Sequence, residues 1–187
     1  LFKHHILYHK IQVFKCSSSK INMKKKQVVV NEDKCTYNSA IVLGLSDALV
    51  ELSGALVGLS FALMETQVIA TVGLITGFAA AMSMAASEYL SAKEDGQKNA
   101  IKASTHTGIA YILAVIALII PYFIFDSAMI ATAVMFSLVI VIIAIYTGYV
   151  SKNNGISFKK KFFTMLTITL GVSVISFIFG TLVKNFV

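Results

Sequence analysis

The chain of 187 residues has little charge, no tryptophan, no arginine and a single proline. Only 13% of its residues are charged and 57% are hydrophobic, whereas soluble domains are about 25% charged and about 45–50% apolar. This composition excludes a soluble globular enzyme, and the high apolar content excludes a disordered chain. The net charge is +7, but the absence of arginine argues against nucleic-acid binding, because specific nucleic-acid readers depend on arginine side chains.

Cysteine is also scarce, with only Cys16 and Cys35, both in the polar N-terminal segment. They form no Cys-x-x-Cys pair and have no histidine at zinc-finger spacing, so we interpret them as reduced structural or incidental thiols. We interpret residues 1–38, which hold eight lysines, as a cytosolic tail. Within it, Met23–Lys26 resembles a start of translation, which makes residues 1–22 a candidate upstream extension. No apolar core with a cleavage site is present, so no signal peptide is predicted.

Long apolar segments make up most of the remaining chain. Each has about 21 to 25 residues, enough for one helical crossing of a hydrocarbon layer about 30 Å thick. They lack the alternation of polar and apolar residues that is typical of membrane barrel strands, so they are predicted to be helices. The predicted fold is therefore all-α, a polytopic membrane protein whose domain at residues 39–187 is a bundle of five transmembrane helices. The segments are 39–63, 67–90, 105–125, 127–149 and 162–183.

The lysines predict the orientation of these helices. Eight lie in the tail, three in the 91–104 connection and four in the 150–161 connection, all on one side of the membrane. The other side holds Lys184 alone. Because cytosolic loops carry an excess of lysine, the N-terminus is predicted to be cytosolic and the C-terminus to lie outside.

The first apolar segment carries two acidic residues on a stripe of small residues. Spacings of three and four place the members of this stripe on one helix face, with Asp47 and Glu51 one turn apart. Because charged groups facing lipid are unfavourable, this face is expected to line a protein interface or a hydrated path. The glycines would allow another helix to pack closely. The stripe consists of Gly44, Asp47, Glu51, Gly54 and Gly58.

The second apolar segment carries a similar stripe that ends in an acid. Met84 lies one turn before Glu88, whereas Met82 lies on a different face, so the geometry favours Met84 as the partner of Glu88. Packing the two stripes against each other would gather Asp47, Glu51, Met84 and Glu88 around one pocket. This is a hypothesis about tertiary contact. The second stripe consists of Gly73, Gly77, Ala81, Met84 and Glu88.

Such a pocket would suit a transported metal ion. Mixed carboxylate and thioether ligands favour first-row transition metals such as Fe²⁺ or Mn²⁺. Two neighbouring, partly desolvated carboxylates resist joint ionisation, and an arriving dication would displace protons from them. Metal and proton would then compete for one site, as an antiporter requires. The alternative is structural: the acids would bond to neighbouring serines or lysines, and the methionine and glycines would serve packing.

The residues Gly44–Glu51 (GLSDALVE) and Ser83–Tyr89 (SMAASEY) resemble the first two helices of the vacuolar iron transporter family. The resemblance extends over residues 39–187. It implies a homodimer that moves Fe²⁺, and often Mn²⁺, out of the cytosol in exchange for protons, along the first helices near the dimer axis. Asp47, Met84 and Glu88 match the family's positions, whereas Glu51 belongs to a prokaryotic branch.

The connection at residues 91–104 departs from the plant-type members of this family. Those members have a long, glutamate-rich cytosolic domain there that captures metal, whereas this connection has only Glu94 and Asp95 as acids. Weaker capture, delivery by a partner protein and a different substrate remain open. Direct delivery of metal to the pocket is the simplest hypothesis.

The sequence therefore predicts a proton-coupled antiporter that exports Fe²⁺ or Mn²⁺ across a membrane, with the metal as substrate and no resident cofactor. In a prokaryote this would be the cytoplasmic membrane. No His-Glu-x-x-His or phosphate-loop motif is present, so an enzyme is not expected. One alternative is a non-transporting assembly or anchoring subunit. Another is a transporter or channel for a different solute.

Overall fold

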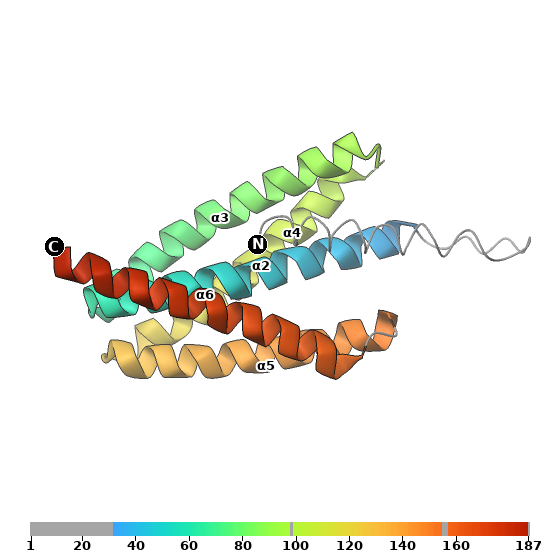
Figure 1. The fold of residues 1–187 in the computed structure, drawn as a ribbon. Coiled ribbons are helices and arrows are strands. Elements are labelled where there is room, and N and C mark those ends of the chain that lie inside the picture. The colour runs from blue at the N-terminus through green and yellow to red at the C-terminus, as the bar shows by residue number, and fades with distance from the viewer. Residues whose placement is uncertain (1–31, 98, 155–156, 187) are drawn as a thin grey trace, which may run out of the picture. The chain divides into compact units, whose positions relative to one another are not determined.

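The computed structural model describes residues 32–97, 99–154 and 157–186, and helices form almost all of these ranges (Figure 1). Each helix contains a stretch long and apolar enough to cross a membrane. The predicted all-α polytopic bundle is confirmed, and the chain is an integral multi-pass membrane protein. The candidate upstream extension at residues 1–22 lies outside the described residues. The helices are α2 (Glu32–Leu63), α3 (Thr66–Glu94), α4 (Ala100–Ile124), α5 (Ala128–Asn154) and α6 (Phe158–Phe186).

The helices extend further than the apolar segments on the lysine-rich side. There, α3 continues to Glu94, beyond the apolar segment that ends at residue 90, and α4 begins at Ala100, before the segment that begins at 105. At the opposite ends the helices stop within a few residues of the segments. The backbone hydrogen bonds of a helix continue into water beyond the hydrocarbon, whereas an apolar segment ends at the first charged residues.

Short connections make successive helices antiparallel neighbours. Between α2 and α3, Met64 adopts a left-handed conformation with φ of 58°, and Glu65 is extended before the helix begins. After α3, Gly96 adopts φ of 70°, and its N–H donates to the Lys93 carbonyl at 3.1 Å. This is the usual role of glycine after a helix, because the left-handed conformation is unfavourable for residues with a Cβ atom.

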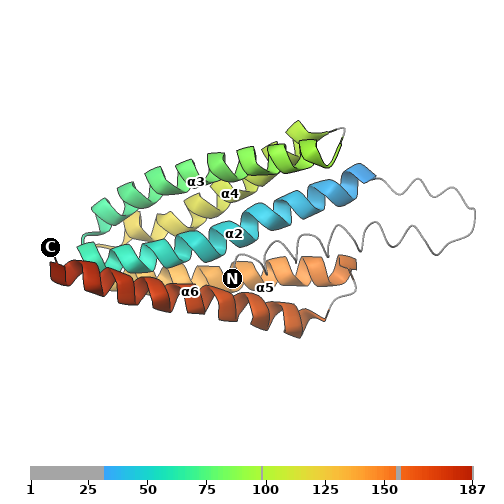
Figure 2. The same ribbon diagram turned by 45° about the horizontal axis from the view of Figure 1, so that its top comes forward.

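The compact unit of residues 40–187 is organised around α2 and α4. In both views, α3 lies along α4, α5 lies beside α6, and α2 passes between these two pairs (Figures 1 and 2). The close approaches of glycines agree with this arrangement. Gly44 of α2 lies against Thr107 of α4, and Gly54 of α2 lies against Val172 of α6. The first helix of the unit is therefore held from two sides.

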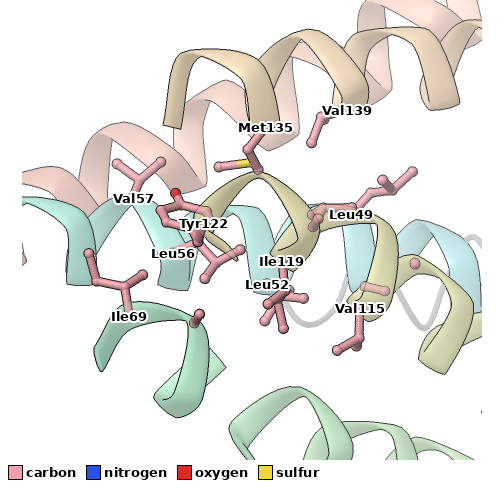
Figure 3. Close-up of a cluster of buried hydrophobic side chains, with 14 of the residues drawn as sticks. Leu49, Leu52, Leu56, Val57, Ile69, Val115, Ile119, Tyr122, Met135 and Val139 are labelled. Atoms are coloured by element: carbon pink, nitrogen blue, oxygen red, sulfur yellow. The ribbon is translucent and has the colours of Figure 1, made fainter. Parts of the chain in front are cut away.

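The apolar core joins α2, α3, α4 and α5 (Figure 3). On α2 its members recur at spacings of three and four, so they form one stripe directed into the bundle. Asp47 and Glu51 lie on roughly the opposite side of α2 from this stripe. Packing of the core therefore directs both acids away from the apolar interior. The core residues labelled in Figure 3 include Leu49, Leu52, Leu56, Ile69, Ile119, Tyr122, Met135 and Val139.

Candidate functional site

Asp47 and Glu51 lie in the middle of the membrane-spanning part of α2, Ala40–Leu63. Asp47 is half-buried and Glu51 is exposed on the surface of the single chain. An ionised side chain exposed to hydrocarbon is strongly unfavourable. In the membrane this face of α2 therefore needs water or protein over it.

Glu51 is held by a residue that sequence reasoning missed. The hydroxyl of Tyr111 in α4 donates a hydrogen bond to Glu51 Oε2 at 3.1 Å. Tyr111 is fully buried, and Asp47 is also close enough to act electrostatically on its hydroxyl. The only sequence signal was a tyrosine in the middle of an otherwise apolar segment, because a buried phenol requires a partner. The site on α2 therefore includes a donor from α4.

The two predicted residues of α3 lie at different depths. Glu88 is buried, with 8% of its surface exposed, and it belongs to the buried stripe of α3 together with Gly77 and Ala81. Met84 is half-buried against the apolar core, whereas Met82 is 56% exposed. The structure thus separates the two methionines as the helical spacing predicted, with Met84 on the inner side and Met82 on the outer side.

In the described ranges, no group of three or more His, Cys, Asp or Glu side chains is placed to hold a metal ion. Asp47 and Glu51 form one pair on α2, next to Tyr111, and Glu88 is buried on α3. The hypothesis that the two stripes gather Asp47, Glu51, Met84 and Glu88 around one pocket therefore stays a prediction.

Most glycines of the two stripes face α4 or α6. Gly54 and Gly58 of α2 face Val172 and Ser176 of α6, and Gly44 faces α4. On α3, Gly77 faces Val115 of α4, so four of the five predicted glycines contact helices other than those expected. Gly73 alone joins α2 and α3, through Leu56. Small residues permit close approach without specifying the partner helix, and here α4 and α6 take up most of that space.

The N-terminal half of α4 ties together the two helices that carry the acids. The Thr107 hydroxyl donates to the Ala40 carbonyl of α2 at 3.2 Å, and the Ser104 hydroxyl donates to the Ala85 carbonyl of α3 at 2.6 Å. A Cβ atom at Gly44 would overlap the Thr107 carbonyl, so the backbones of α2 and α4 are nearly in contact there. These contacts fix the acid-bearing stretches of α2 and α3 relative to α4.

A second polar cluster lies near the turn after α2. The hydroxyls of Ser60, Tyr122 and Thr132 form a buried ring, with oxygen separations of 2.9 to 3.1 Å. Tyr122 also borders a cavity of about 270 Å³ that is lined by Gln67 and Asp126 among others. The apolar core separates this ring from Glu51, so the ring is a structural tie between α2, α4 and α5.

The first two spans are similar to a known protein family. Residues 38–98 match the family model described as VIT family, a range that contains the membrane-spanning part of α2, all of α3 and the four predicted metal-site residues. Over these residues the chain is similar to the VIT family. No curated protein matches the chain.

Proposed function

We propose that this protein exports Fe²⁺ or Mn²⁺ from the cytosol in exchange for protons. The similarity of its first two spans to the VIT family supports this proposal. The observation that carries this proposal is the pair of acids within the membrane-spanning part of α2, with Tyr111 hydrogen-bonded to one of them. Acidic residues inside a membrane domain mark ion and proton pathways, because a bilayer does not tolerate them without such a role.

Glu51 supports an assembly of two chains. Its carboxylate is exposed in the single chain, in a part of α2 that must cross hydrocarbon. A second copy packed against the same face of α2 would cover it and would add a second Asp47 and a second Glu51. In a homodimer, four carboxylates would then border the shared axis, which supplies the group of ligands that one described chain lacks.

The chemistry of the ligands supports a transition metal as substrate. Carboxylate oxygens from Asp47 and Glu51 suit Fe²⁺ and Mn²⁺, and the Met84 thioether favours them over Mg²⁺ or Ca²⁺. Met84 is half-buried and Glu88 lies one turn further along α3. We assign both to the same pathway at a second position, closer to the lysine-rich side than the α2 pair.

Proton coupling follows from competition for the same oxygens. A carboxylate binds a metal ion only in its ionised form, so metal entry displaces protons and proton return displaces metal. The Tyr111 hydroxyl donates to Glu51 and holds its carboxylate in one orientation. Tyr111 therefore orients Glu51 and does not itself bind the metal ion.

The lysines support an orientation with the N-terminus in the cytosol. Exposed lysines lie at the helix ends on one side of the bundle. They are Lys93, Lys102, Lys152, Lys159 and Lys160. This is the distribution expected for cytosolic connections, and in a prokaryote the membrane would be the cytoplasmic one. Export would then run from the lysine-rich side towards the short turns.

Metal tolerance of cells tests this function. Cells that produce the protein are expected to accumulate less iron or manganese and to survive higher external concentrations of the metal. Glu51→Gln should abolish both effects at equal membrane abundance. Glu65→Gln is the matched control, because Glu65 is exposed in the turn before α3 and outside the proposed pathway. Equal protection by wild type and Glu51→Gln would contradict the assignment.

A further inference from the structure

Lys161 is buried at the start of α6, although its neighbours in the sequence are exposed. Only 7% of the Lys161 surface is accessible, whereas Lys159 and Lys160 are exposed. Its ammonium lies 5.1 Å from the centre of the Tyr146 ring in α5. Within the described part of the chain, this ring is the one partner found for the ammonium. A buried ammonium normally has an anion beside it, because an ammonium without one is strongly unfavourable.

The start of α6 concentrates positive charge where a helix already carries it. Three consecutive lysines, Lys159 to Lys161, occupy the first turns of the helix, and the first turn contains no acid. The N-terminus of a helix carries a partial positive charge and normally attracts acidic side chains. Lysines there are mildly unfavourable, and a bound anion would offset this. The burial of Lys161 and the charge of the helix end therefore point to the same kind of ligand.

Exposed aromatic side chains place this region at the depth of lipid headgroups. Tyr149 is 57% exposed and Phe158 is 43% exposed, at the end of α5 and the start of α6 respectively. Phe158 stacks on Phe162, with ring centres 5.7 Å apart. Tyrosine is enriched at the boundary between hydrocarbon and headgroups, so the exposed Tyr149 favours that depth for the end of α5. Lipid phosphates are present at this depth.

We propose that the junction of α5 and α6 binds the phosphate of an anionic phospholipid, through the Lys161 ammonium held over the Tyr146 ring. The ring orients the ammonium without neutralising it, because a cation–π contact leaves the N–H donors available for a phosphate. Lys160 lies beside it at the surface and adds a second positive charge. This site is distinct from the acids of α2 and α3, and it does not depend on the proposed transport activity.

The test compares lipid binding by the purified full-length protein and two matched variants. Bound phosphatidylglycerol and phosphatidylcholine are measured by native mass spectrometry during titration. Lys161→Met removes the buried charge but keeps an apolar stem of similar length, and Lys159→Met removes one exposed charge from the same turn. We expect wild type to prefer phosphatidylglycerol, and Lys161→Met to reduce this preference about tenfold or more, the effect of one charge-assisted hydrogen bond. Lys159→Met should reduce it by no more than about fivefold.

Four outcomes would overturn the assignment. An equal loss of phosphatidylglycerol preference in Lys161→Met and Lys159→Met would mean that the lipid is attracted by the charged surface in general and not by a specific site at Lys161. Equal binding of phosphatidylglycerol and phosphatidylcholine by wild type would exclude the site. This result does not depend on whether Lys161→Met folds. Displacement of phosphatidylglycerol by inorganic phosphate at similar concentration would assign the site to a free anion. Retained preference in Lys161→Arg, which keeps the charge over Tyr146, would support the proposal, and its loss would contradict it.

Discussion

The hydroxyl of Tyr111 lies 3.1 Å from Glu51 Oε2 and joins the middle of α4 to the acidic face of α2. Tyr111 is fully buried, whereas Glu51 lies on the exposed side of α2. The phenol therefore reaches from the core to the edge of the proposed pathway. It gives Glu51 a fixed orientation that neither helix could supply alone.

Removing the Tyr111 hydroxyl should weaken metal binding without unfolding the protein. In Tyr111→Phe the Glu51 carboxylate loses a donor, and a hydrogen bond to a charged group contributes about 1.5–3 kcal/mol. We expect the apparent KM for metal uptake to rise about tenfold or more. Initial uptake rates in proteoliposomes measure this.

Tyr122→Phe is the matched control for that experiment. Tyr122 is also a buried tyrosine of α4, but its hydroxyl bonds to Ser60 and Thr132 and contacts no acid. This variant should lose about 0.5–2 kcal/mol of stability, the range measured for polar contacts in membrane bundles, and keep its KM. A rise in KM equal to that of Tyr111→Phe would mean that lost packing, and not the bond to Glu51, changes transport.

The two methionines of α3 provide a test of the thioether ligand. Met84 is half-buried on the inner side of α3, and Met82, two residues earlier, is 56% exposed. Met84→Ala should weaken Fe²⁺ binding by about tenfold, while Met82→Ala should leave it unchanged within about twofold, since only one of the two can act as a ligand. Isothermal titration under anaerobic, reducing conditions measures the affinities. Equal affinities in the two variants would exclude Met84 as a ligand.

At the crossing of α2 and α6, a larger side chain in place of glycine should destabilise the protein. A Cβ atom at Gly180 would overlap the Gly58 carbonyl, whereas a Cβ atom at Gly171 would have no heavy atom within 4 Å. Gly180→Ala should destabilise the protein by about 1–3 kcal/mol, as overpacking does. Gly171→Ala should be neutral or stabilising by up to about 1 kcal/mol, because alanine favours helix. Thermal unfolding in detergent measures both, and similar melting temperatures would contradict the close crossing.

A cysteine on the acidic face of α2 should cross-link two copies of the chain. Ala55 is exposed one turn after Glu51, and Ala79 is exposed on α3. With Cys16 and Cys35 replaced by serine, Ala55→Cys should form a disulfide-linked dimer in membranes under mild oxidation. Ala79→Cys should not, because we place that face of α3 against lipid. A dimer from Ala79→Cys alone would move the interface away from Glu51.

The sequence predicted the number and type of helices because hydrocarbon imposes a strong requirement on length and polarity. It did not predict how far α3 and α4 continue on the lysine-rich side, because helical hydrogen bonding does not depend on hydropathy once the chain has left the bilayer. At the opposite helix ends, beside the short turns, the predicted and observed boundaries agree more closely. There, as at Met64 and Glu65, the connection is so short that the chain reverses as soon as the span is complete.

The sequence predicted the shared face of the α2 acids but not which helices pack beside them. Spacing identified Asp47 and Glu51 as one face, because a single helix fixes that relationship. It did not identify Tyr111 as the partner of Glu51, since that contact depends on which helix occupies each side of α2. Glycine patterns indicate that close contacts exist, yet Gly54 could face any neighbour, and in the structure it faces α6.

Exchange of metal and protons at the acids of α2 is measured by metal uptake into proteoliposomes with an acidic lumen. Internal pH and uptake of Fe²⁺ or Mn²⁺ are recorded together under reducing conditions for wild type, Asp47→Asn and Asp126→Asn. Asp126 is an exposed acid in the turn between α4 and α5 and serves as the control. The account predicts metal entry coupled to loss of lumenal protons in wild type and Asp126→Asn, and neither flux in Asp47→Asn. Folded wild-type protein that moves neither metal and causes no pH change would contradict it, and would favour a non-transporting membrane subunit.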